Sequence, residues 1–325
     1  MSASRGFALV LASSTLCGCA VAGCAGPEPV VAESSRPVAV VLPLISASES
    51  ATPTPPAAQP IPGGAFACGD LSCQVFPSPE LAFKHVLDTD KPLVLALGES
   101  HAQKGAPNVR STTVRFTEQL LPALEGKASS LVLELWVADG KCNKATEKKV
   151  AEQQKEVTKT QAEGNTNEFV KLGEKSKALA IVPFILRPTC AEYDTIKNAG
   201  DNAVLEMLAM ITRNMKTKVE TLFKETEKKS PGKMVVTYGG SMHNDIAPVA
   251  GRESWSFAAD LDRLAAGRYV ELDLIVPEYI KDSDSWKKLP WYSAYEPERF
   301  ASSVVLIKVA PKSYAMVFAR SAAAP

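Results

Sequence analysis

Two of the three histidines in this chain follow the same local pattern, in which an apolar run ends at a glycine and a histidine lies three residues further on. The runs are LVLALGESH, which ends at His101, and MVVTYGGSMH, which ends at His243. Histidine titrates near neutral pH and is the commonest metal ligand in proteins. A hydrogen-bonded structural histidine is the ordinary interpretation of either residue alone. Because histidine is so scarce here, two equivalent positions predict a shared catalytic or ligand site.

Two glutamates belong to the same candidate site. Glu99 lies two residues before His101, where it can face the same space or support the imidazole. Glu134 lies inside the apolar run LVLELW, and a buried carboxylate is costly unless it is paired or hydrogen-bonded. We expect Glu134 to be a site residue, with half of a buried ion pair as the alternative. Histidine or glutamate can act as a general base toward water; His101, His243 and Glu99 could instead hold a divalent metal that lowers the pKa of that water.

The residues around the second motif indicate ligand contacts but not a serine nucleophile. The sequence GGSMH resembles the turn that presents the serine of α/β-hydrolases, with Ser241 in the serine position, but His243 replaces its final glycine. In that fold the order along the chain is serine, acid, histidine, and no histidine follows His243. We therefore expect Ser241, Tyr238 and the turn glycines to contact a ligand, since glycine lets the backbone approach closely. These glycines are Gly98 and Gly240.

Apolar runs and helical patterns alternate along the chain and would position these residues. The runs, typical of buried parallel strands, span 92–98, 130–137, 180–186, 233–240 and 268–276. The helical patterns span 108–126, which Pro122 should bend, 201–223, which Asp201 or Asn202 can cap, and 256–267, which Gly267 closes. On the second helix the predicted buried face carries Leu205, Leu208, Ile211, Met215, Val219 and Leu222.

This alternation predicts an α/β fold with a mainly parallel central sheet and helices on both faces. Residues 302–310 and 313–321 flank a Pro-Lys turn and should form a C-terminal antiparallel hairpin at one sheet edge. In such sheets ligands bind beyond the carboxyl ends of the strands, which is where both histidine motifs would lie.

Two segments stand outside the alternation. Residues 141–178 are dense in Lys, Glu and Gln with few large apolar side chains, which predicts a charged helical insertion without core residues, either a plain surface helix or a lid over the site. Residues 286–300, WKKLPWYSAYEPERF, concentrate Trp and Tyr. We expect that segment to cover one end of the core; a wall of a ligand pocket is the alternative.

The first residues resemble an export signal. A positive charge at Arg5 precedes the apolar run FALVLASSTL, which is too short to span a membrane. The LCGC and VAGC that follow are similar to the lipobox of bacterial lipoproteins, so we expect lipidation at Cys19 or Cys24. Ordinary secretion with cleavage near Ala22 or Ala25 is the alternative.

The predicted organisation is a signal peptide with its lipidation site over residues 1–24, a disordered Pro/Ala/Ser-rich tether over 25–64 and a single domain over 65–325. The protein would then be exported and lipid-anchored to a bacterial membrane, in the periplasm or at the cell surface. Its 36 basic and 36 acidic residues form no long single-sign block outside one mixed segment, which argues against a nucleic-acid partner.

Four cysteines remain beyond the leader, an even set that predicts disulfides in an exported chain. Cys68 and Cys73 are close enough in sequence to bridge locally, and Cys142 would then pair with Cys190. A zinc site made of all four is the alternative, although it would lack the usual CxxC pairs.

The block LVLALGESHAQKGAPNVRSTTVRFTEQLLPALEGKASSLVLELWV resembles the superfamily that joins the haem-binding ChaN lipoproteins, the erythromycin esterases and the Tiki/TraB proteins. The shared pattern is a strand that ends in Gly-Glu-x-His, a helix, a strand with an acidic residue near its end, and a late Gly-x-x-His. The matching residues are Gly98, Glu99, His101, Glu134, Gly240 and His243. The chain departs from ChaN in lacking further His and Asp after the first motif, and from the esterases in having fewer histidines.

The resemblance implies two functions of different kinds. One is a hydrolase, of esterase or metal-dependent peptidase type, in which two histidines and two glutamates activate water on a small-molecule or peptide substrate. The other is a binding lipoprotein that holds haem or another ligand without catalysis; Tyr238 or the aromatic residues near 291 would be its partners, since tyrosine and histidine both serve as axial ligands. A decayed site on a structural or partner-binding lipoprotein is the third interpretation.

Overall fold

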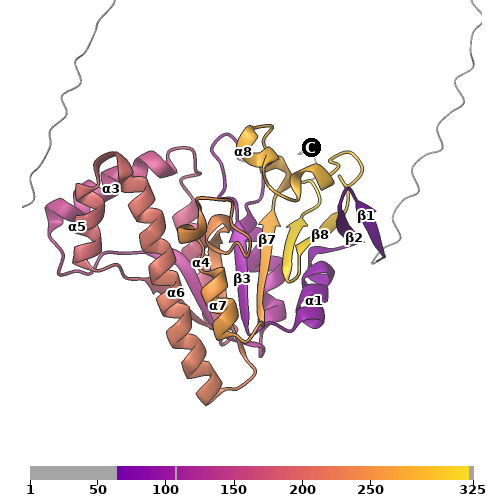
Figure 1. Ribbon diagram of the computed structural model, residues 1–325, viewed down its shortest axis with the longest axis horizontal. Helices are drawn as coiled ribbons and strands as arrows, with labels where there is room; N and C mark the ends of the chain where they lie inside the picture. Colours follow the sequence, from indigo (N-terminus) through magenta and orange to yellow (C-terminus); the bar gives the residue numbers. More distant parts are fainter. Residues whose placement is uncertain (1–63, 107, 322–325) are drawn as a thin grey trace, which may run out of the picture. The chain divides into compact units, whose positions relative to one another are not determined.

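The computed structural model describes residues 64–106 and 108–321. The predicted signal peptide and nearly all of the predicted tether therefore lie outside the described residues. The described part is a mixed α/β domain built on one nine-stranded sheet, in the order β1-β2-β8-β9-β7-β3-β6-β4-β5 (Figure 1). The strands are β1 (Ala65–Cys68), β2 (Leu71–Phe76), β3 (Val94–Glu99), β4 (Ala128–Trp136), β5 (Val182–Leu186), β6 (Met234–Gly240), β7 (Tyr269–Ile275), β8 (Val304–Ala310) and β9 (Ser313–Val317).

The centre of the sheet is parallel, as predicted. β7, β3, β6, β4 and β5 are neighbours in this order, and all pair in parallel. They correspond to the five apolar runs of the sequence, with bounds that differ by no more than two residues. Within this parallel set, Gly98 of β3 is in register with Gly239 of β6 on one side and with Asp273 of β7 on the other. Both histidine motifs therefore follow the carboxyl ends of two neighbouring parallel strands, on the same side of the sheet.

The C-terminal hairpin forms, but its predicted place at the sheet edge is wrong. β8 and β9 pair antiparallel, β9 also pairs in parallel with β7, and β2 pairs antiparallel with the other side of β8. The edge is β1, whose hairpin with β2 is closed by the Cys68–Cys73 disulfide. These two strands are short and interrupted by the GD turn, so they lack the long apolar run by which the others are recognised.

The α-helices are α1 (Pro79–Asp90), α2 (Thr112–Arg115), α3 (Lys144–Thr158), α4 (Asn165–Ala178), α5 (Cys190–Asn198), α6 (Ala203–Lys229), α7 (Ala258–Leu264) and α8 (Asp284–Lys287). After α2 the chain continues in the π turn η1 (Phe116–Leu120) and the 3-10 turn η2 (Leu121–Leu124), so the predicted helix is not regular and Pro122 lies at the start of the 3-10 turn. The other 3-10 turns are η3 (Gly200–Asn202), η4 (Ser241–His243), η5 (Glu253–Trp255), η6 (Pro277–Tyr279) and η7 (Tyr292–Ala294).

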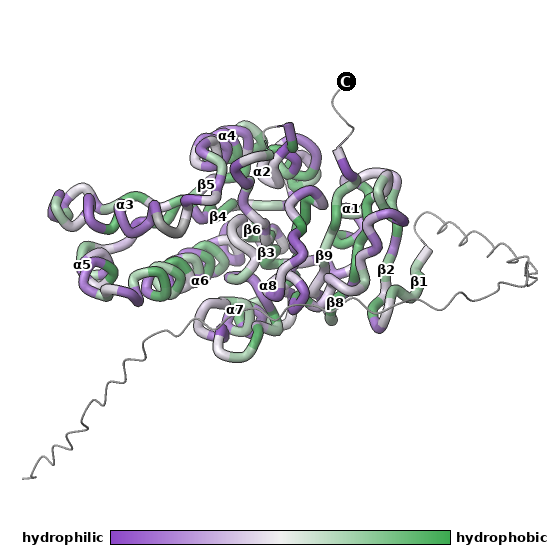
Figure 2. The backbone as a smooth tube through the Cα atoms, turned by 90° about the horizontal axis from the view of Figure 1, so that it is seen from above, coloured by the Kyte–Doolittle hydropathy of each residue, from purple (hydrophilic) through white to green (hydrophobic). Residues whose placement is uncertain are grey.

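Helix α6 is amphipathic, with hydrophobic and hydrophilic residues alternating around it (Figure 2). Its predicted face is correct from Ile211 onward and wrong at the start, because Leu205 is 46% exposed while Met207 and Met210 are buried. Leu205 lies six residues before Ile211, which at 3.6 residues per turn puts it on another side of the helix. Asn202 occupies the N-cap position but makes no side-chain capping hydrogen bond.

The charged insertion forms two helices, α3 and α4, and the expectation that it lacks core residues is wrong for both. Val150 of α3 is buried in one core cluster, together with Val132 of β4. Phe169 and Leu172 are buried in the cluster that also contains Leu97 of β3 and Leu133 of β4. Two large apolar residues three positions apart are enough to give a charged helix one buried stripe. The aromatic segment near residue 291 packs in a cluster with the Cys68–Cys73 hairpin and covers that end of the core.

Both predicted disulfides are present, Cys68–Cys73 and Cys142–Cys190. Because every one of these thiols is in a disulfide, the alternative four-cysteine zinc site is not formed. Among the described helices, none combines the length and the apolar composition needed to cross a bilayer.

The disulfides give a direct chemical expectation. Peptide mapping after alkylation without reductant should find no modified cysteine among Cys68, Cys73, Cys142 and Cys190, whereas alkylation after unfolding and reduction should label all four. Changing Cys142 and Cys190 together to serine should lower the unfolding free energy by about 2–4 kcal/mol. Labelling of all four thiols in the protein without reductant would contradict the assignment.

Candidate functional site

Glu99, the last residue of β3, is a buried carboxylate with three hydrogen-bond donors around it. His101 Nδ1 lies 2.6 Å from Glu99 Oε1, and Glu99 Oε2 accepts from Thr113 Oγ1 at 3.0 Å and from Tyr238 OH at 2.8 Å. Only 3% of Glu99 is exposed. Hydrogen-bond donors from α2, from β6 and from the loop after β3 thus converge on one carboxylate.

Tyr238 lies beneath Glu99 in the core and does not present its hydroxyl to solvent. Its ring is fully buried, stacks on Phe116 with centroids 4.9 Å apart and meets Phe169 edge-on at 5.5 Å. Burial and then the charge of Glu99 raise the pKa of Tyr238 well above its usual range, so the phenol stays a hydrogen-bond donor. The structure therefore places Tyr238 within the core as a support of Glu99.

His101 is held as a cation. Burial alone would lower its pKa, but the hydrogen bond to Glu99, the charge of Glu99 and the charge of Glu134 outweigh burial and raise the pKa to about 9. The side chain remains 25% exposed. With Nδ1 engaged by Glu99, the Nε2–H of the ring is left to face outward from this pair. At neutral pH, His101 can therefore donate a proton or a hydrogen bond to a bound group.

Glu134 is positioned by the backbone of the second histidine motif. Its Oε2 accepts from the Gly240 N–H at 2.6 Å, and its Oε1 lies 3.8 Å from His243 Nε2. β4 is irregular here, because its register with β5 shifts between Leu133 and Trp136. The carboxylate lies against Gly239, where a Cβ would be only 2.5 Å from Glu134 Oε2. A glycine at 239 thus makes room for Glu134 to lean toward the turn.

The contacts of His243 determine which of its nitrogens carries a hydrogen when the ring is neutral. Nδ1 lies 2.9 Å from the Trp255 carbonyl oxygen and 2.9 Å from Thr212 Oγ1. A carbonyl oxygen can only accept, so Nδ1 must be the donor there. The Nε2 of the neutral ring then carries a lone pair, and it is this atom that faces Glu134. His243 is suited to accept a proton and His101 to donate one.

The two Glu–His pairs meet above Gly240. A Cβ placed on Gly240 would lie 3.4 Å from Glu134 Oε2, 3.9 Å from His101 Nε2 and 4.0 Å from His243 Cδ2. All three groups therefore border one small space over this residue. Ser241 begins the 3-10 turn η4, and its Cα approaches Gly98, where a Cβ would lie only 2.8 Å away.

Among the described residues, no three His, Cys, Asp or Glu side chains are arranged to hold a metal ion. The predicted metal site of His101, His243 and Glu99 is therefore not formed. Glu99 is bonded to Nδ1 of His101, whereas the Nε2 of that ring faces the space above Gly240. His101 and His243 are the residues that could ligate a metal, through their Nε2 atoms.

Several supporting residues escape sequence analysis. Thr113 bonds Glu99, and Thr212 bonds His243 from the buried face of α6. Phe169 of α4 lies beside His101, with ring centroids 6.3 Å apart, and the loop before α4 donates Ala162 N–H to Ala102 O at 2.7 Å. Of these residues, only Thr212 could have been found from the sequence, because it is a polar residue next to Ile211 in the apolar pattern of the helix.

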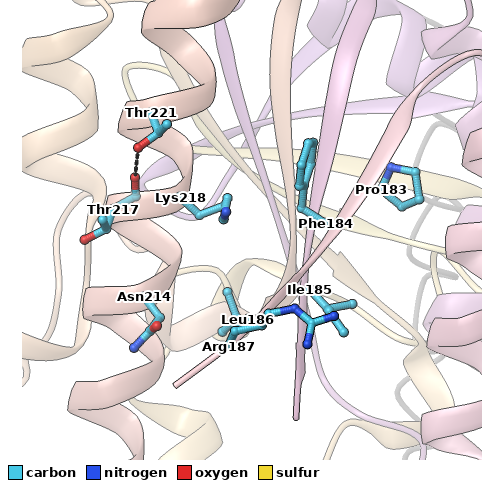
Figure 3. Close-up of a pocket in the computed structure, with 9 residues that line it drawn as sticks. All are labelled: Pro183, Phe184, Ile185, Leu186, Arg187, Asn214, Thr217, Lys218 and Thr221. Atoms are coloured by element: carbon cyan, nitrogen blue, oxygen red, sulfur yellow. Dashed lines mark hydrogen bonds between the residues drawn. The ribbon is translucent and has the colours of Figure 1, made fainter. Parts of the chain in front are cut away.

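Two cavities in the described part of the chain lie away from these residues. One, of about 390 Å³, runs between β5 and α6 and is bordered by Phe184, Arg187 and Lys218 (Figure 3). Another, of about 400 Å³, lies near Pro92 and Lys233 at the amino ends of the strands. Neither is lined by a residue of the Glu–His site.

Neither protein-family models nor curated proteins nor solved structures give a match to this chain.

The His101–Glu99 pair predicts a pH-dependent stability. Because the folded-state pKa of His101 lies above its ordinary value, the stabilisation from protonated His101 is fully present below about pH 6.5 and is lost as the pH rises through about 9. The loss should be on the order of 1–3 kcal/mol, given the partial exposure of the ring. Urea unfolding from pH 6 to 10 measures it. A His101→Gln variant is the control, and an identical pH profile in that variant would rule out His101 as the source.

Proposed function

We propose that this protein is a hydrolase, of esterase or peptidase type, which activates water with Glu99, His101, Glu134 and His243. The observation that carries the proposal is the meeting of two Glu–His pairs over Gly240. The His101 ring can donate through its Nε2–H, and the His243 ring, whose Nδ1 bonds the Trp255 carbonyl oxygen, turns its Nε2 toward Glu134. A proton acceptor and a proton donor on one small space are what acyl-transfer chemistry with water requires.

In the proposed reaction, a water above Gly240 gives its proton to His243 Nε2 while its oxygen bonds to the substrate carbonyl carbon. Glu134 stabilises the imidazolium that forms, because its Oε1 lies 3.8 Å from that nitrogen. The carbonyl electron pair moves to oxygen, where the His101 Nε2–H stabilises it. The bond to the leaving group then breaks, the leaving group takes its electron pair and the His101 proton, and solvent exchange returns the proton from His243 to His101.

The superfamily resemblance supports this proposal through the order of its residues along the chain. The six matching positions lie at the ends of β3 and β6 and near the end of β4, at one edge of the sheet. A metal bound by His101 and His243 would lower the pKa of the water, as the resemblance to the metal-dependent peptidases implies. Haem or ligand binding without catalysis is the alternative, and the buried position of Tyr238 beneath Glu99 makes it the weaker one.

The test is a substrate panel with a spectrum. The full chain is incubated with chromogenic esters and fluorogenic peptides, with and without a chelator, and its visible absorption is recorded with and without added haem. We expect turnover of at least one ester or amide that His243→Ala abolishes, and chelator sensitivity only if a metal assists. No turnover, together with a Soret band that depends on His101, would replace the hydrolase with the haem carrier.

We also propose that the protein is an exported lipoprotein, anchored through Cys19 or Cys24. The two disulfides support export, because such bonds persist in oxidising compartments. Changing Cys19 and Cys24 together to serine should move the protein from the membrane fraction to the soluble fraction. Each single change should reveal which cysteine carries the lipid. A double variant that stays membrane-bound in high salt would refute the anchor.

A further inference from the structure

A polar ladder runs along β7 in an otherwise apolar strand. Tyr269, Glu271 and Asp273 alternate with Val270, Leu272 and Leu274, so the polar side chains share one face of the sheet. Tyr269 is fully buried and Glu271 is 5% exposed. In YVELDLI an interior strand has three polar groups where packing alone would favour apolar ones, and buried polar groups are costly unless they are bonded.

The first two members of the ladder bond the segment that directly follows His243. Tyr269 OH donates to the Asn244 carbonyl oxygen at 2.7 Å. Glu271 Oε2 accepts from the Ile246 N–H at 2.9 Å. Both contacts lie within three residues of His243, and both come from a strand that is neither β3 nor β6. They fix the backbone where η4 ends.

The third member, Asp273, reaches the same segment from across Gly98. A Cβ on Gly98 would lie 2.0 Å from Asp273 Oδ1, 2.9 Å from Asn244 Nδ2 and 2.8 Å from Ser241 Cα. The carboxyl, the amide and the start of η4 are therefore neighbours over this glycine. Asp273 Oδ1 and Asn244 Nδ2 are both buried, and neither has a hydrogen-bond partner in the described part of the chain. The acceptor and the donor lie on the same side of Gly98, so a small movement of either side chain would let them bond.

We propose that Tyr269, Glu271 and Asp273 are positioning residues, which fix residues 244–246 on the sheet and so aim the His243 ring at Glu134. The opposite side of His243 is already held, because its Nδ1 bonds Trp255 O and Thr212. The ladder supplies the second constraint, on the backbone. This proposal rests on the proposed function only because it takes His243 as a site residue.

The ladder acts mainly through hydrogen bonds and not through charge. Burial, followed by the charge of Asp273, raises the pKa of Glu271. Burial, followed by the charge of Asp245, raises the pKa of Asp273. Burial thus favours the protonated form of each carboxyl, and a protonated carboxyl can donate a hydrogen bond as well as accept one.

The test reads the histidine rings directly. In the full chain labelled with ¹⁵N-histidine, the three histidines give three sets of imidazole signals. Tyr269→Phe, which removes one hydroxyl, and Asp273→Ala should each shift the ring nitrogens of His243 and leave those of His85 and His101 in place. Asp273→Asn, which keeps an oxygen facing Asn244, should restore the His243 signals.

Thr237→Val is the matched control. Thr237 is fully buried on the neighbouring strand β6, and its Oγ1 has no hydrogen-bond partner in the described part of the chain. This isosteric change should leave all three rings unaffected. If Tyr269→Phe folds and leaves the His243 signals unchanged, the positioning role is overturned, even if Asp273→Ala fails to fold. The spectra decide this whether or not any substrate is hydrolysed. In an active protein, kcat should fall in Tyr269→Phe while KM changes little.

Discussion

Replacing His101 with alanine is expected to lower the rate of hydrolysis by about 10²–10⁴-fold, the usual contribution of a positioned acid or base. The fold should survive the change, because Glu99 keeps Tyr238 and Thr113 as donors when the imidazole is removed. Unfolding free energy at neutral pH should fall by only about 1–3 kcal/mol, the part that His101 protonation contributes.

His85→Ala is the matched control for this experiment. His85 is the third histidine of the chain and lies on α1, where its ring contacts Phe76. It shares no hydrogen bond with the Glu–His pairs among the contacts of the described residues. Hydrolysis should therefore persist in this variant, measured on the ester or peptide that the panel identifies. Equal losses in the two variants would show that a general effect, such as lower stability, explains the result.

Two glycine-to-alanine changes should have opposite consequences, and the first concerns stability. On Gly98 a methyl group would lie 2.0 Å from Asp273 Oδ1 and 2.8 Å from Ser241 Cα, much closer than atoms can approach. Relief requires β7 or η4 to move, since one of the two contacts is with backbone. Gly98→Ala should lower the unfolding free energy by about 3 kcal/mol or more, seen as a lower midpoint in urea.

Gly240→Ala should instead leave the fold intact and block the reaction. The φ of Gly240 is −62°, which alanine adopts without strain. The new methyl would make ordinary contacts of 3.4 Å with Glu134 Oε2 and 3.9 Å with His101 Nε2, but it would fill the space where the water is proposed to lie. Turnover should be lost while the urea midpoint changes little. A fully active Gly240→Ala would place the reaction elsewhere.

The parallel strands and the two histidine motifs could be predicted from sequence because both depend on local patterns. Apolar runs that end in glycine mark where β3 and β6 stop, and parallel strands bring such ends to one edge. The pairing of β1 and β2 beyond the C-terminal hairpin could not be predicted, since it depends on which long-range partner two short strands find. The buried stripe of α4 was missed because Phe169 and Leu172 are diluted by charged neighbours.

The side-chain partners of the site were beyond sequence analysis for a different reason. Thr212 and His243 are 31 residues apart and meet only because α6 packs beside η4. The group that faces Nδ1 is a carboxylate at His101 and a carbonyl oxygen at His243, and no local pattern encodes this difference. The strand ends in the sequence predict that the two histidines lie close together. The chemical role of each histidine depends on its tertiary contacts.

The Cys142–Cys190 disulfide turns the segment that contains α3 and α4 into a covalent ring, whose closure points are 48 positions apart in the sequence. A ring has fewer extended conformations than an open chain of the same length. Phe169, which lies beside His101, is a residue of this ring. The bond that closes the ring therefore also restricts, in the unfolded chain, the segment that carries this wall of the site.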